Sequence, residues 1–111
     1  MITLEENINK IKKFKEYERN WNGYDAEPFA EDFLNFIEGM LPNLKKQPQI
    51  FPVSDGSIQF EYDGENGKYL EVQLSQDNQM KCYFEADDGR FVEQAGMTDY
   101  SVINIMAEKL L

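Results

Sequence analysis

The chain has 111 residues, with 21 acidic and 11 basic side chains, no histidine, one cysteine and a formal net charge of −10. This length suits one compact unit, so residues 1–111 are expected to form a single α+β domain. Without histidine there is no Ser-His-Asp triad, no Cys-His pair and no His-ligated zinc, and one cysteine excludes an internal disulfide.

Two amphipathic helices are expected in the N-terminal part of the chain. The first covers residues 3–19, where apolar side chains recur at helical spacing and Thr3 with Glu6 forms a capping box. The second begins near Pro28 and ends at Pro42, because proline suits a first helical turn but cannot continue a helix. The apolar stripe of this second helix consists of Phe29, Phe33, Phe36, Ile37, Met40 and Leu41.

From residue 49 onward the apolar residues recur with a period of two, which is typical of strands. Three clear strands at residues 58–63, 70–75 and 80–85 are followed by a weaker strand at 90–94. The turns between them are short and polar, and short connections require antiparallel pairing. Pro52 limits the segment around it to an edge strand at most, so the meander has four strands, or five if this segment pairs.

A last helix is expected from Thr98 to Leu111, with Thr98 as its N-cap and Tyr100 in its buried stripe. The order is therefore two helices, an antiparallel meander and a C-terminal helix, which is an α+β fold. Each strand has one apolar and one polar face, so the helices are expected to pack on one face of the sheet.

Few residues suggest chemistry. Cys82 lies between Met80 and Phe84 on the apolar side of its strand, which favours an inert core thiol over a nucleophile. The paired carboxylates Asp87 and Asp88 precede a glycine, as is typical of a hairpin turn. We therefore assign no catalytic residue, no cofactor and no metal ligand from the sequence.

Two sets of residues are candidates for binding a partner. The first is the polar face of the sheet, represented by Glu61, Glu71, Tyr83 and Glu85, where acidic charge and an aromatic ring could dock a basic protein or imitate a nucleic-acid backbone toward a nuclease. The alternative is an ordinary solvated face. The second set is Trp21 and Tyr24, which either staple the corner between two helices or offer a second contact.

Short motifs in the first two thirds of the chain resemble one family. Trp21-Asn22-Gly23-Tyr24 followed by Ala26 and Pro28 matches a W-[DN]-G-x-x-A-x-P element, and the segment 55–62 matches D-G-x-I-x-F/L-E-W/Y, with Tyr62 where tryptophan is common. This pattern resembles a family of small bacterial and phage-associated proteins without an assigned activity. Members resemble accessory proteins of mobile elements and toxin–antitoxin neighbourhoods, so the resemblance implies binding rather than catalysis.

The leading hypothesis is a cytoplasmic, non-enzymatic acidic protein, similar to an antitoxin, immunity protein or inhibitor, that binds a basic protein partner. Direct nucleic-acid binding is not expected because acidic charge repels phosphate, and no apolar run approaches the ~20 residues of a membrane span. The alternative is a homodimeric secretion-chaperone-like or scaffolding protein that pairs through an open sheet edge. A carboxylate-dependent enzyme ranks third.

Overall fold

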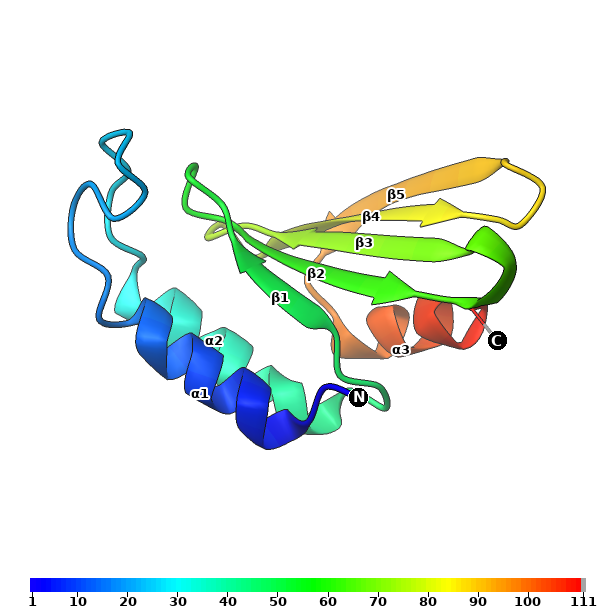
Figure 1. Ribbon diagram of the computed structural model, residues 1–111, viewed down its shortest axis with the longest axis horizontal. Helices are drawn as coiled ribbons and strands as arrows, with labels where there is room; N and C mark the ends of the chain where they lie inside the picture. The colour runs from blue at the N-terminus through cyan, green and yellow to red at the C-terminus, as the bar shows by residue number, and fades with distance from the viewer. Residues whose placement is uncertain (111) are drawn as a thin grey trace.

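The structure of the protein is a computed structural model that describes residues 1–110. It confirms the expected α+β fold, with two N-terminal helices, an antiparallel sheet and a C-terminal helix (Figure 1). Within these residues the elements are α1 (Leu4–Phe14), α2 (Glu31–Met40), η1 (Leu41–Asn43), β1 (Gln49–Pro52), β2 (Ile58–Asp63), η2 (Glu65–Gly67), β3 (Tyr69–Leu74), β4 (Gln79–Glu85), β5 (Phe91–Met97) and α3 (Tyr100–Glu108).

The sheet is a five-stranded meander in the order β1-β2-β3-β4-β5, and every neighbouring pair is antiparallel. The segment around Pro52 therefore does form the fifth strand, and it lies at one edge as expected for a strand that ends in proline. The weak strand predicted at 90–94 is longer than expected and extends to Met97 at the opposite edge.

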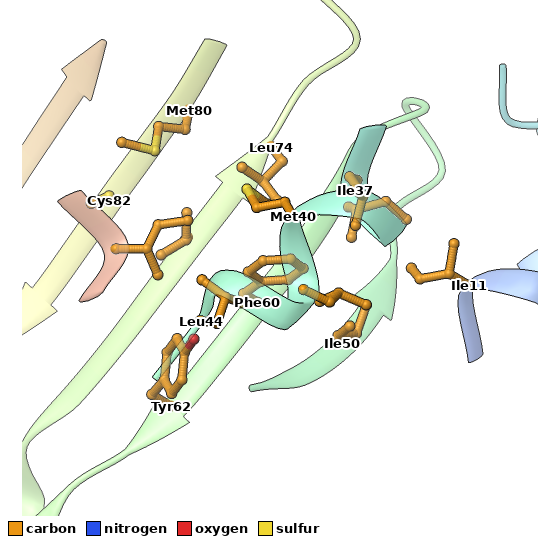
Figure 2. Close-up of a cluster of buried hydrophobic side chains, with 14 of the residues drawn as sticks. Ile11, Ile37, Met40, Leu44, Ile50, Phe60, Tyr62, Leu74, Met80 and Cys82 are labelled. Carbon is orange, nitrogen blue, oxygen red and sulfur yellow. The ribbon is translucent and has the colours of Figure 1, made fainter. Parts of the chain in front are cut away.

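All three helices lie on the same side of the sheet (Figure 1). The inward-facing side chains of β1 to β4 meet the helices in one hydrophobic core, because residues of alternating positions share a face. Phe60 and Leu74 of the sheet and Met40 of α2 belong to this core (Figure 2). Burying a side chain of this size contributes about 1.5–3 kcal/mol, so the covered face supplies most of the stability.

Helix α1 begins as its sequence predicts but ends earlier. The Thr3 hydroxyl accepts a hydrogen bond from the Glu6 backbone N–H at 3.1 Å, which confirms the N-cap. The helix ends at Phe14, whereas the spacing predicted helix to residue 19. The chain leaves the helix because Tyr17 turns to stack on Trp21, at 5.1 Å between ring centroids.

The starts of the other two helices differ by two or three residues from the expectation. Helix α2 begins at Glu31, since Phe29 is buried among aromatic rings before the helix starts. The N-cap of α3 is Asp99 rather than Thr98, because the Asp99 carboxylate accepts the Ser101 N–H at 2.9 Å. Tyr100 is consequently in the first turn and 40% exposed, so its expected place in the buried stripe is wrong.

Candidate acidic face and groove

The outer face of the sheet carries most of the residues predicted to bind a partner. Its side chains come from alternate positions of all five strands, as the strand register requires. Five of them are carboxylates and one is an ammonium group, which gives this face a net charge of −4. The charged members are Glu61, Asp63, Glu71, Glu85, Glu93 and Lys81.

Glu61 and Glu71 form the centre of this face. They are directly opposite each other on β2 and β3, and Tyr83 of β4 continues the same row. The Gln59 amide donates to both carboxylates, at 2.6 Å to Glu61 Oε2 and 3.2 Å to Glu71 Oε1. Within residues 1–110 neither carboxylate has an ion pair with a lysine or arginine, because Lys81 pairs with Glu93 instead.

Aromatic rings border these carboxylates. The Tyr69 hydroxyl donates to Glu71 Oε1 at 3.0 Å, and burial together with the Glu71 and Glu61 carboxylates raises the pKa of Tyr69, so the hydroxyl remains a donor. Tyr83 stacks on Phe91 at 5.4 Å between ring centroids. Glu85 is opposite Tyr69 in the next row. The face thus combines negative charge with partly exposed apolar rings.

The structure brings Glu61, Glu71, Tyr83 and Glu85 together on one face, as their alternation predicts. Tyr69 was missed in the sequence, although its position two residues before Glu71 on the same strand was a sufficient signal.

Trp21 and Tyr24 lie elsewhere, in the loop between α1 and α2 (Figure 1). The Trp21 indole N–H donates to the Glu27 carbonyl at 2.8 Å, and its ring packs against Tyr17 and Phe29. Through these contacts Trp21 stabilises the corner between α1 and α2, which is one of the two roles that the sequence suggested for it. Tyr24 is 89% exposed, so the stapling role is wrong for Tyr24, and its contact with a partner stays a prediction.

A groove between α2, the start of α3 and the last two strands was not predicted. It has a volume of about 800 Å³ and a mainly apolar lining. Phe36, expected in the buried stripe of α2, is 46% exposed on its wall, and Tyr100 is there too. Sequence periodicity missed the groove because it identifies the apolar face of a helix but not whether the sheet beside that face is covered.

The polar groups of the groove are mostly uncharged amides and hydroxyls, from Asn35, Asn43, Gln94, Thr98 and Tyr100. Among the described residues that line it, Asp99 is the one carboxylate, and hydrogen bonds from Ser101 lower the pKa of Asp99, so this side chain stays ionised as a helix cap. Cys82 lies in the floor, where burial raises the pKa of the thiol. In the described part of the chain, no three carboxylate or thiol side chains lie close enough together to hold a metal ion.

Comparisons with known proteins add no family to this description. No family model matches the chain, and neither a curated protein nor a solved structure does. The resemblance of the Trp21–Pro28 segment therefore stays a prediction. Among residues 1–110 no helix is long and apolar enough to cross a membrane.

Proposed function

We propose that this protein is a non-enzymatic binding protein whose outer sheet face docks a basic protein partner. The observation that carries this proposal is the pair Glu61 and Glu71, which lie opposite each other and form no ion pair with a lysine or arginine of residues 1–110. Like charges opposite each other on neighbouring strands destabilise a sheet. A basic group from a partner would remove that repulsion, and the net negative face would attract such a partner from a distance.

Aromatic side chains on the same face supply the second element of a docking surface. Tyr69 and Tyr83 are partly buried and held by contacts within the sheet, so little conformational entropy is lost when a partner covers them. Rigid tyrosine rings are enriched among residues that contribute most to protein–protein affinity. An antitoxin, immunity protein or inhibitor directed at a basic target would need this combination of charge and anchor.

The location of the carboxylates favours binding over catalysis. The opposed pair Glu61 and Glu71 lies on the outer face, whereas Asp99 is the one carboxylate among the described residues that line the groove on the inner side of the sheet. A general acid and base need to share a site from which water can be excluded. We also propose a cytoplasmic location, which the single unpaired Cys82 supports because it is in keeping with a reducing compartment.

Charge reversal on the outer face tests the proposal. The variant with Glu61→Lys, Glu71→Lys and Glu85→Lys is used beside the wild type to capture partners from the native host, with identification by mass spectrometry. The control carries the same change of charge at exposed sites off the sheet, as Glu16→Lys, Glu18→Lys and Glu65→Lys. We expect a basic protein that is retained by the control and lost from the outer-face variant. Equal capture by both variants would mean that the outer face is only solvated.

A stability measurement provides an independent check on the opposed carboxylates. Glu61→Gln removes one of the two charges but keeps a side chain of the same shape. We expect the free energy of unfolding to rise by about 0.5 kcal/mol while binding of the captured partner weakens. A variant that loses stability would contradict the repulsion on which the proposal is based.

A further inference from the structure

Strand β5 forms an open edge of the sheet. All seven of its residues are exposed, and they include the large apolar side chains of Phe91, Val92 and Met97, which are 62%, 57% and 67% exposed. The strand contains no proline and no lysine, and Glu93 is its one charged residue. Natural sheets usually protect an edge with such residues or cover it, because an unpaired edge can accept another strand.

The hydrogen bonds at the two ends of the β4–β5 pair fix which backbone groups of β5 are free. Ala86 N–H donates to the Arg90 carbonyl at one end, and Thr98 N–H donates to the Asn78 carbonyl at the other. Hydrogen-bonded positions alternate along an antiparallel pair, so the even-numbered residues of β5 direct their backbone groups toward β4. The residues that direct theirs outward are Phe91, Glu93, Ala95 and Met97.

These outward groups are complementary to those of a second copy. A two-fold axis at Gln94 would place Phe91 opposite Met97 of the second copy and Glu93 opposite its Ala95. In this register each hydrogen-bonded position pairs one outward-directed residue of the first copy with one of the second. The two strands also overlap along their whole length. The alternation of outward and inward backbone groups along β5 therefore permits the register in which the two strands overlap completely.

The side chains also suit this register. On the outer face the exposed Phe91 and Met97 would cover each other, which removes apolar surface from water. Glu93 would be opposite a small alanine rather than a second Glu93. Lys81 is already opposite Ala95 within one chain, so the lysine of one copy would share a row with Glu93 of the other.

We propose that two copies of this chain associate through β5 and form one continuous antiparallel sheet. The pairing is isologous, because each copy uses the same strand in the same way. The acidic outer faces of the two copies would then lie on the same side of the extended sheet. This association does not depend on the proposed docking of a basic partner.

Sedimentation equilibrium at an ionic strength of about 0.15 M, where charges more than ~8 Å apart are largely screened, tests the association. We expect the wild type to reach twice the 13.0 kDa mass of one chain as concentration rises. Ala95→Pro removes one outward N–H without removing a bond to β4, and we expect it to stay monomeric. Ala95→Ser keeps that N–H and is the matched control, which we expect to dimerise.

Charge pairs test the register and do not rely on proline. Phe91→Glu combined with Met97→Glu places like charges opposite each other, and we expect the dissociation constant to rise at least about tenfold. Phe91→Lys combined with Met97→Glu places opposite charges there, and we expect association to return. Circular dichroism checks that each variant is folded. A wild type that is monomeric at the highest soluble concentration would overturn the proposal, and so would equal association of the two charge-pair variants.

Discussion

The two edges of the sheet differ in how they are protected. At β1 the Lys10 ammonium donates to the Ile50 carbonyl at 3.0 Å, and the strand ends at Pro52, which has no N–H to offer. At β5 neither device is present and every residue is exposed. Both strands belong to the same meander, so strand pairing alone does not decide whether an edge is open. At β1 the protection comes from Lys10 of the neighbouring helix α1 and from Pro52 of the strand itself.

Helix α1 is fixed to the start of β1 by a buried amide. Asn7 is 1% exposed, and its Nδ2 donates to the Pro48 carbonyl and to the Gln47 side chain, each at 3.0 Å. A buried amide without these partners would be costly, so the contact sets where the helix lies along the edge. At the opposite edge of the sheet the groove lies between α2, the start of α3 and β5.

The largest expected difference between the edges is in side-chain truncation. Ile50 and Val92 both face the inner side of the sheet, but Ile50 is 1% exposed and Val92 is 57% exposed. We expect Ile50→Ala to lower the free energy of unfolding by about 3 kcal/mol, because it leaves a cavity in the core. Val92→Ala should change it by no more than about 0.5 kcal/mol. Urea unfolding measures both, and similar losses would show that β5 is as well packed as β1.

A smaller effect is expected when the protection of β1 is removed. Lys10→Met deletes the ammonium that binds the Ile50 carbonyl and lies 5.7 Å from the centre of the Phe51 ring. We expect a loss of about 1 kcal/mol, typical of one hydrogen bond. Lys12→Met changes the same charge at another exposed site on α1 and should have little effect. If the two variants unfold at the same urea concentration, the Lys10 contact does not protect the edge.

The smallest expected effect concerns Cys82, which lies on β4 beside the open strand. Burial raises the pKa of this thiol above its ordinary value of about 8.5. As pH rises through that value the unfolded thiol ionises first, so the free energy of unfolding should fall as pH rises above about 8.5. Cys82→Ala should show a shallower fall than the wild type in urea unfolding. Parallel pH profiles would mean that β5 leaves the thiol in contact with water.

Alternation and turn chemistry predicted the strands well. Ile58, Phe60 and Tyr62 are buried as their period requires, and the residues between them lie on the outer face. The candidate site on that face followed from the same pattern, since Glu61 and Glu71 had to point away from the core. These features depend on positions within one strand or one hairpin, which is why local reasoning was sufficient.

Expectations that depended on neighbours in space were less successful. Phe36 and Tyr100 have the helical spacing of core residues, but both line an open groove. Their exposure depends on how far the helices extend beneath the sheet, and no local pattern contains that information. Phe29 is buried without being helical because the aromatic rings of Tyr17 and Trp21 lie against it.

The sequence by itself determined the α+β order, the antiparallel meander and the two faces of each strand, because these follow from periodicity and from the short turns. Only the tertiary structure decided that β1 is covered, that β5 is open and that Glu61 and Glu71 oppose each other without an ion pair to any lysine or arginine in the described part of the chain. These properties depend on register and on helix placement, which are set by contacts between residues distant in the chain. The surfaces proposed for binding both depend on such contacts.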